Sequence, residues 1–396
     1  MTVAAIGSLA SSQTGFVLPQ ASSDLSTDMT HANEILVAMK NEGIVNIERK
    51  LETVSGAGVE VNIRNLYRPG GLPNLGDGDP YENADVPKYG NRSLNINKFW
   101  KSFEFDRPTS FSQQMTSIDL QKFHPENYKN YFADLFLKGL MTQGGSATNL
   151  SLSSPDLDLS GITGTDRTKL TMGNAAIAPS GEYHQVAGEL VASKTPQTLT
   201  SSDTLTVGML MKAATEIGKT RANLTRWNIK SVNELGCVFI AQSDLFNLMN
   251  QSVSIGNNYV FGDVYQRQIQ AKDAKEIGGI IHSFTMPGIP FKFWVLPDSY
   301  FEAAVSTADS SSVANTRRLF ILGRNALDVA FGRINAGKDV SSPFVVKVDN
   351  NWKPLGVKSF GLAQGAFGGK KAQIPNKSTG TATDWATYTI DVHTGA

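Results

Sequence analysis

The chain has 396 residues, more than the roughly 250 to 300 at which one hydrophobic core stops growing, so two domains or one elaborated domain are expected. Hydrophobic residues make up 40% of it and charged residues 18%, a composition that excludes an intrinsically disordered protein. The 36 basic residues balance the 36 acidic ones, so no net field draws the whole molecule to nucleic acid or to an anionic membrane.

The single cysteine and the N-terminal residues indicate where the chain folds. Cys237 lies in an apolar run and can form no internal disulfide, so a buried residue in a reducing compartment such as a cytoplasm is expected. The apolar stretch 3–10 is short and follows no basic residue, which argues against a secretory signal. No stretch has the length of a membrane span, so we expect a soluble protein made without export.

The first elements predicted are an extended arm and a helix. Residues 1–26 are rich in Ser, Thr, Ala and Gly without a sustained period, which indicates an arm that cannot order itself alone. From Asp28 onward, apolar residues recur at helical spacing, and Gly43 is expected to end the helix.

Two alternating segments with a long loop between them predict a protruding hairpin. Apolar residues alternate with polar ones over 59–64 and again over 94–97, with Phe103 and Phe105 following. The loop 65–93 is packed with Gly, Pro, Asn and Asp, and a loop of that length usually has a function, often as an arm that packs on something else.

Two further helices flank a polar segment. Pro125 begins the strongest predicted helix, and Gly144-Gly145 ends it. Residues 150–202 are polar and predict an insertion or linker with weak strands near 183–191. Ser202-Asp203 is expected to cap the next helix, whose apolar residues are Leu205, Leu210, Ala213, Ala214 and Ile217.

The rest of the chain predicts a second domain and an extended end. Residues 233–337 combine apolar strands at 237–241, 291–296 and 319–322 with a helix at 243–250, which is typical of an α+β domain. Strands return at 344–348 and 357–362, and the polar tail after Gly368 indicates an extended end.

No motif predicts catalysis. The segment from Gly332 to Lys338 has phosphate-loop spacing, but Asp339 stands where a hydroxyl must bind magnesium, so we expect a plain turn. The carboxylates Asp77, Asp79, Glu82 and Asp85 lack calcium-loop spacing, which favours a solvated loop or one that pairs with a basic patch on a neighbour. The five histidines are scattered, so we predict no enzyme, no cofactor and no metal.

Basic and aromatic residues flank the same loop. Such a mixture binds single-stranded nucleic acid by stacking and phosphate contacts, or forms a protein interface. Zero net charge and the acidic cluster in the same loop favour a protein interface. The residues predicted to form a subunit interface are Arg64, Arg68, Asp77, Asp79, Glu82, Lys88 and Arg92.

The order of these elements resembles the Hong Kong 97 capsid fold, and most of the chain resembles the major capsid family of the N-four-like podoviruses. Order and spacing, rather than any one motif, carry the resemblance. The matching segments are 56–61 at the hairpin entry, 103–106 and 127–140 along the long helix, 238–241 before Asp244-Leu245, and 319–326.

The resemblance implies a division of this α+β chain into named parts. These are an N-terminal arm (1–26), an N-terminal helix and lead-in (27–58), an E-loop hairpin (59–106), a peripheral domain (107–232) with a spine helix at about 125–143 and an insertion at about 145–202, an axial domain (233–337), return strands of the peripheral domain (338–368) and a C-terminal tail (369–396).

The same resemblance implies a structural protein that self-assembles into hexamers and pentamers of an icosahedral phage head around double-stranded DNA. Its expected partners are other copies, which the hairpin loop overlies, a portal, scaffolding or decoration proteins, and DNA by non-specific contact, with no membrane. The expected location is the virion, after assembly in the bacterial cytoplasm. Two alternatives are an encapsulin-like compartment, which shares the fold, and a surface polysaccharide-binding protein or hydrolase.

Overall fold

The structure is a computed structural model, and it describes most of the strands and only parts of the loops. The described residues are 35, 38–48, 59–66, 89–106, 128, 131–132, 135–137, 140, 153–154, 157–158, 183–190, 193–219, 227, 234–249, 275–277, 281–286, 288–304, 306, 312–331, 344–349, 358–375 and 382–395.

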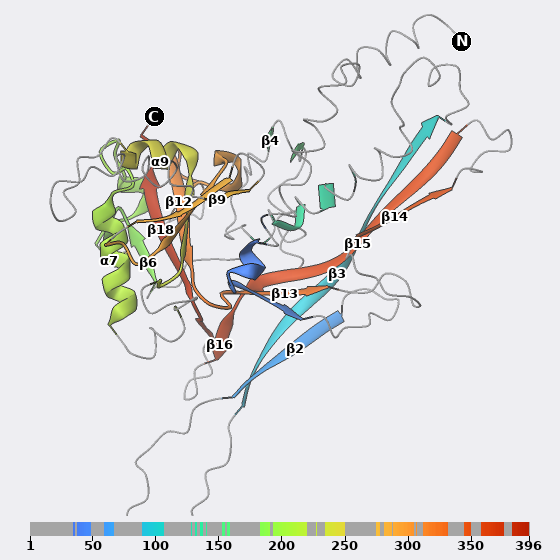
Figure 1. Cartoon of the computed structure of the whole chain (residues 1–396), viewed down its shortest axis with the longest axis horizontal. Helices are drawn as coiled ribbons and strands as arrows, with labels where there is room; N and C mark the ends of the chain where they lie inside the picture. The colour runs from blue at the N-terminus through green and yellow to red at the C-terminus, as the bar shows by residue number, and fades with distance from the viewer. Residues whose placement is uncertain are drawn as a thin grey trace, which may run out of the picture.

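An eight-stranded sheet lies at the centre of one lobe (Figure 1). Its strands β8 and β12 are buried at every position, so both of their faces are covered. Neighbours pair antiparallel except for two parallel pairs, β6 with β18 and β8 with β11. In spatial order the strands are β7 (Glu189–Leu190), β6 (His184–Val186), β18 (Thr387–His393), β12 (Thr316–Leu322), β8 (Cys237–Ala241), β11 (Lys292–Leu296), β10 (Ile281–Thr285) and β9 (Lys275–Ile277).

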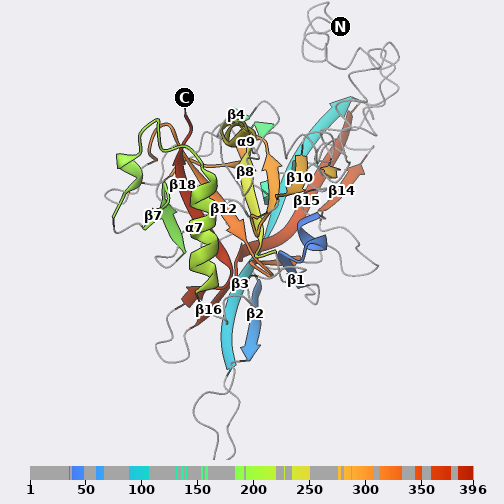
Figure 2. The same ribbon diagram turned by 60° about the vertical axis from the view of Figure 1, so that its left-hand side comes forward.

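Within the described residues, two α-helices accompany this sheet (Figure 2). Helix α7 (Val207–Gly218) buries Leu210, Ala213 and Ile217, as its apolar spacing predicts. The predicted cap at Ser202-Asp203 is wrong: Thr206 caps the helix by accepting a hydrogen bond from the Met209 N–H. Helix α9 (Gln242–Met249) follows β8 directly, and the short 3₁₀ turns η2 (Pro196–Thr198) and η3 (Asp298–Tyr300) complete the lobe.

Asp203 serves a turn rather than the helix. Its carboxylate accepts hydrogen bonds from the Thr200 backbone N–H and from Lys194 Nζ. An aspartate accepts hydrogen bonds from nearby backbone N–H groups both in a turn and at the start of a helix. The presence of an aspartate in the sequence therefore does not distinguish a turn from a helix cap.

A six-stranded sheet forms the second, elongated layer (Figure 1). The strand signals at 59–64, at 94–97 with 103–105, and at 344–348 are confirmed as parts of β2, β3 and β14, and the signal at 357–362 is confirmed from Lys358 onward as part of β15. The order is β1 (Val45–Glu48), β13 (Leu327–Phe331), β15 (Lys358–Lys371), β3 (Tyr89–Asp106) and β2 (Val59–Leu66), with β14 (Phe344–Asp349) also paired to β15. Two small pairs, β4 (Ser153–Ser154) with β5 (Leu157–Asp158) and β16 (Gln373–Pro375) with β17 (Ala382–Asp384), lie outside both sheets.

Residues of the predicted long helix pack on the six-stranded sheet. Residues 128, 131, 132, 135–137 and 140 are helical, and the remaining residues of 125–143 are outside the described ones. The Phe136 ring meets the edge of Phe367 in β15, with 5.0 Å between ring centroids. Gly369 in β15 permits the close approach of the helical Leu140, because a Cβ atom at residue 369 would collide with the Leu140 side chain.

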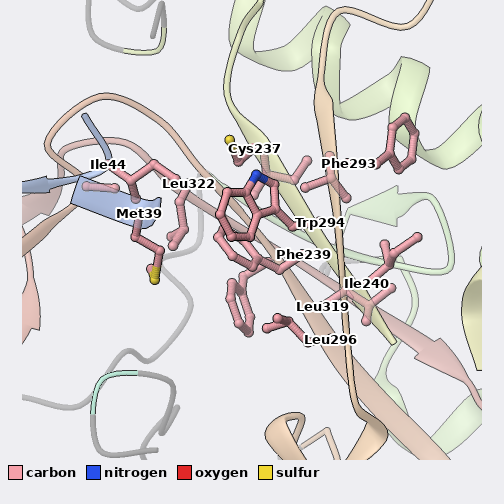
Figure 3. Close-up of a cluster of buried hydrophobic side chains, with 14 of the residues drawn as sticks. Met39, Ile44, Cys237, Phe239, Ile240, Phe293, Trp294, Leu296, Leu319 and Leu322 are labelled. Atoms are coloured by element: carbon pink, nitrogen blue, oxygen red, sulfur yellow. The ribbon is translucent and has the colours of Figure 1, made fainter. Parts of the chain in front are cut away.

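The first helix ends as its sequence predicts. Gly43 has a φ of 76°, its N–H bonds to the Lys40 carbonyl, and the Ile44 N–H bonds to the Met39 carbonyl. This pair of bonds is the Schellman arrangement, in which glycine takes the left-handed position at no steric cost. Met39 and Ile44 are both buried and lie beside Leu322 (Figure 3), so the helix end joins the core that runs through both sheets.

The tail 369–396 is not an extended end. Residues 387–393 form β18, all seven are buried, and the strand pairs with β12 on one side and β6 on the other. The low apolar content of the tail hid a strict alternation, in which Tyr388, Ile390 and Val392 occupy one face.

Sheet membership divides the chain differently from the predicted domains at three further points. Strands β6 and β7 fall inside the predicted insertion 145–202, yet they belong to the eight-stranded sheet. Strand β13 falls inside 233–337 but belongs to the six-stranded sheet, because the chain passes from one sheet to the other between Leu322 and Leu327. Strand β15 runs to Lys371, past the predicted end of the return strands at 368.

Candidate assembly surface

Among the described strands, β2 pairs with β3 and with no other strand. Strand β2 pairs antiparallel with the first half of β3, from Val59 opposite Ile96 to Leu66 opposite Tyr89. The second half of β3 pairs with β15, from Asn97 to Asp106. The β2–β3 ribbon therefore projects from the molecule (Figures 1 and 2) while its base is part of the six-stranded sheet.

Two of the predicted interface residues lie in this ribbon. Arg64 in β2 is opposite Asn91, and Arg92 in β3 is opposite Ile63, so the two arginines occupy neighbouring rungs of the ladder. The other five, namely Arg68, Asp77, Asp79, Glu82 and Lys88, lie outside the described residues, as do Lys338 and Asp339 of the phosphate-loop-like segment.

Strand β3 has one covered face. Phe103 stacks on Tyr128 with 4.2 Å between ring centroids, and Phe99 stacks on Phe367 at 4.9 Å. Lys101 Nζ lies 4.4 Å from the centroid of the Tyr131 ring. These contacts place Phe99, Lys101 and Phe103 on the face of the sheet on which Tyr128 and Tyr131 pack.

From Lys98 to Glu104 the opposite face of β3 is exposed, whereas Leu94 and Ile96 on that face are buried. Trp100 is 66% exposed, and Lys98 and Ser102 beside it are exposed as well. In the paired strand β15, Gln364 lies opposite Trp100 and Leu362 opposite Ser102, and both are half-buried. We call these five residues, Lys98, Trp100, Ser102, Leu362 and Gln364, the Trp100 face.

Sequence reasoning missed the Trp100 face, although a signal was present. Over 98–104 the alternation places residue 100 in the same register as the polar residues Lys98, Ser102 and Glu104. A tryptophan in a polar register is an apolar residue directed toward solvent, which is a mark of an interaction surface.

Charged residues inside the eight-stranded sheet form fixed networks. Asp391 in β18 accepts hydrogen bonds from Arg318 in β12, Nε at 2.5 Å and Nη2 at 2.8 Å, and lies 2.8 Å from His184 Nε2 in β6. Burial raises the pKa of Asp391, but Arg318 and His184 outweigh it and hold the pKa below its usual range.

A second network surrounds the start of α9. Arg317 donates to Asp244 and to Asp298, both at 2.9 Å. Burial raises the pKa of Asp244 above its usual range, because the attraction of Arg317 offsets only part of the cost of desolvation. Every carboxylate in both networks is engaged with a cation, which is the pattern of a structural frame rather than of a catalytic base.

Neither a metal site nor a membrane span occurs in the described part of the chain. No group of three or more His, Cys, Asp or Glu residues there could hold a metal ion. No helix within the same described residues is both long and apolar enough to cross a membrane.

Comparison with known proteins finds similarity in structure alone. Neither a protein family nor a curated protein matches the sequence. The structure is similar to the capsid of Ralstonia phage GP4, with a TM-score of 0.61, 15% identity and coverage of 90% of this chain and 88% of that chain. It is also similar to the capsid asymmetric unit of cyanophage Pam1, with a TM-score of 0.54, 13% identity and 90% of each chain covered.

A weaker structural match is to an encapsulin shell. The holo-SrpI encapsulin complex of Synechococcus elongatus matches with a TM-score of 0.42 and 9% identity over 91% of this chain and 88% of that chain, a score too low for an assignment. The predicted mixture of helices and sheets is confirmed, while membership of the N-four-like podovirus family stays a prediction. The chain has the fold of phage capsid proteins.

Proposed function

We propose that the chain is the major capsid protein of a tailed phage and self-assembles into the hexamers and pentamers of an icosahedral head. The observation that carries the proposal is the structural match with the Ralstonia phage GP4 capsid, which covers about nine tenths of both chains.

The shape of the molecule supports assembly. The eight-stranded sheet and its helices form a solid lobe, and the β2–β3 ribbon projects from it (Figure 1). Head-to-tail contacts between a body and a projecting element generate closed rings when the rotation between copies closes. Zero net charge removes the self-repulsion that keeps copies apart.

The hairpin is the part proposed to contact a neighbouring copy. Its base contributes Arg64 and Arg92, and its loop contributes Arg68, Asp77, Asp79, Glu82 and Lys88. Opposite charges within one loop fix the register between copies more than they add affinity.

The remaining partners follow from the same proposal. They are a portal, scaffolding or decoration proteins, and double-stranded DNA bound without sequence preference. The protein acts in the virion after assembly in the bacterial cytoplasm, as a structural subunit without catalytic activity or cofactor and without a membrane.

The test is to express the chain alone and with its neighbouring genes, and to examine the product by negative-stain microscopy and light scattering. Closed particles, or rings of five or six copies, are expected. Shells that enclose a cargo protein would instead identify an encapsulin-like compartment. A monodisperse monomer under every condition would contradict the proposal and return the polysaccharide-binding protein or hydrolase to consideration.

A further inference from the structure

We propose that the Trp100 face of one copy is the docking site for the acidic loop segment 74–86 of a second copy. The inference rests on the proposed assembly function and names the surface that the hairpin loop meets. It is carried by an exposed tryptophan, by complementary charge and by the reach of the loop.

The apolar contact is centred on Trp100. Its side chain is 66% exposed, although Phe103 of the same strand stacks on the helical Tyr128 and Phe99 stacks on Phe367 in β15. Tryptophan is among the residues that contribute most to binding when a partner desolvates them. The segment 74–86 offers Leu75 and Tyr81 as apolar partners for the indole ring.

Charge selects this segment as the occupant. Residues 74–86 hold Asp77, Asp79, Glu82 and Asp85 and no lysine or arginine, so the segment has four negative charges and no positive one. Lys98 lies two residues from Trp100 on the same face, is exposed, and forms no ion pair within the described part of the chain. A lysine beside an exposed aromatic is complementary to an acidic segment that contains an aromatic.

The reach of the loop indicates that the segment comes from a second copy. Trp100 is 100 − 89 = 11 positions beyond Tyr89, where the pairing of β2 with β3 ends. At about 3.3 Å per residue this is roughly 36 Å along the strand, directed away from the loop. Asp77 is 77 − 66 = 11 positions beyond Leu66, so a chain's own loop reaches its own Trp100 only if it is fully extended straight backward.

The experiment uses charge reversal on each side of the proposed contact. One variant carries Lys98→Glu on the face, and the other carries Asp77→Lys and Asp79→Lys in the loop. We expect each variant alone to need about a tenfold higher subunit concentration to assemble. In each variant, repulsion replaces an attractive charge pair at every interface, and this raises the dissociation constant about tenfold. An equimolar mixture should assemble within about threefold of the wild-type concentration, because each variant loop then meets a complementary variant face.

Lys101→Glu is the matched control. Lys101 is in the same strand, is exposed, and undergoes the same change of charge, but it lies on the opposite face, over Tyr131. Assembly of this control close to the wild-type concentration is expected. Equal losses for Lys98→Glu and Lys101→Glu would overturn the choice of face.

Further outcomes separate this inference from the proposed function. Variants that assemble like the wild type would overturn the docking site and leave the shell function intact. If the mixture fails but one chain with all three substitutions assembles, the contact lies within one copy and the inference is wrong. A wild type that never assembles would instead overturn the proposed function.

Trp100→Ala gives a second readout that does not depend on charge. Because Trp100 is exposed, its removal should leave the melting temperature of the free subunit unchanged within the usual effect of a surface substitution. Loss of a central interface tryptophan should raise the assembly concentration about thirtyfold. Assembly at the wild-type concentration would count against the Trp100 face.

Discussion

Asp391 shows how one buried carboxylate connects three strands. It lies in β18, its two oxygens accept from Arg318 in β12, and His184 in β6 bonds to one of them. All three side chains are nearly or fully buried. Removal of the negative charge leaves the Arg318 guanidinium without compensation inside the sheet, which is the costly way to break a buried ion pair.

Asp391→Asn should therefore lower the free energy of unfolding of the subunit by about 3 to 5 kcal/mol at neutral pH. Urea denaturation followed by circular dichroism measures the change. The control is Glu216→Gln, which breaks the exposed pair with Lys219 and should cost less than about 0.5 kcal/mol. Equal costs for the two variants would show that the Asp391 network contributes little.

Asp244 and Asp391 should respond to pH in opposite directions. The folded pKa of Asp391 is lowered, so its contribution is complete above the unfolded pKa of about 3.9 and is lost as the pH falls through the folded pKa. The folded pKa of Asp244 is raised, so its contribution is complete below about 3.9 and is lost as the pH rises through the folded pKa.

Unfolding free energies of the wild type, Asp391→Asn and Asp244→Asn between pH 3 and 7 test this contrast. Relative to the wild type, Asp244→Asn should gain stability as the pH rises, because the wild type then ionises a buried carboxyl. Asp391→Asn should lose less, relative to the wild type, as the pH falls toward 3. Parallel curves for the three proteins would contradict the assigned shifts.

At the scale of elements, the central strand β18 is the part whose removal should do most damage and the part least visible in the sequence. It joins the β6–β7 hairpin to the rest of the eight-stranded sheet, since β6 pairs with β18 and β7, and β12 pairs with β18 and β8. Without β18, buried apolar residues such as Leu319 and Ile321 would lose their cover.

Truncation before Thr387 should therefore yield an insoluble or unfolded chain, whereas truncation after His393 should leave the fold intact. Beyond β18, the main bond that ties the chain end to the body runs from the Thr394 N–H to the Asn315 carbonyl. Circular dichroism and limited proteolysis compare the two truncations. A folded product from the shorter chain would show that β18 is dispensable.

The elements found from sequence are those with a strong local pattern. Periodicity of apolar residues predicts the α7 helix and the strands β8, β11 and β12. A glycine predicts the end of the first helix at Gly43. Strand β18 has no such local pattern, because four of its seven residues are polar, namely Thr387, Thr389, Asp391 and His393. Burial of Asp391 is tolerable only because partners distant in sequence, such as Arg318, form hydrogen bonds with it. The Trp100 face was missed for a related reason. Which face of β3 is exposed depends on which face the helical residues Tyr128 and Tyr131 cover, and the sequence of β3 does not record this.

At the scale of the whole molecule, the domains implied by resemblance and the sheets of the structure divide the chain differently. Sheet membership is set by pairing between distant segments, for example β1 with β13 and β6 with β18, and no local pattern records it. The β2–β3 ribbon at the base of the hairpin is the part that both views treat as projecting from the body.

Deletion of residues 74–86 should leave a folded subunit that forms no shells. The deletion removes the acidic segment and leaves the pairing of β2 with β3 unchanged, so the melting temperature should change little. Microscopy and thermal melting measure the two effects separately. Normal particles from this variant would refute the interface role of the loop.

Reversal of charge at Arg68 and Lys88 together should weaken assembly more than it lowers the melting temperature. Both residues are in the loop proposed to contact a neighbour, so their effect belongs to association rather than to folding. Light scattering gives the assembly concentration and circular dichroism the melting temperature. The opposite ranking would indicate that the two residues support the fold of the subunit.

The position of β18 in the sequence also determines when the eight-stranded sheet can be completed during synthesis. His184 in β6 pairs with Thr389, which is 389 − 184 = 205 residues later in the chain. At roughly 5 to 20 residues per second, β6 leaves the ribosome about 10 to 40 s before its partner exists. During that interval the nascent chain holds an unfinished sheet, so a ribosome that stalls early releases a product with an open core rather than a near-complete subunit. Chaperones and proteases then recognise incomplete chains by their exposed apolar surface, which keeps defective copies from competing for places in the growing particle.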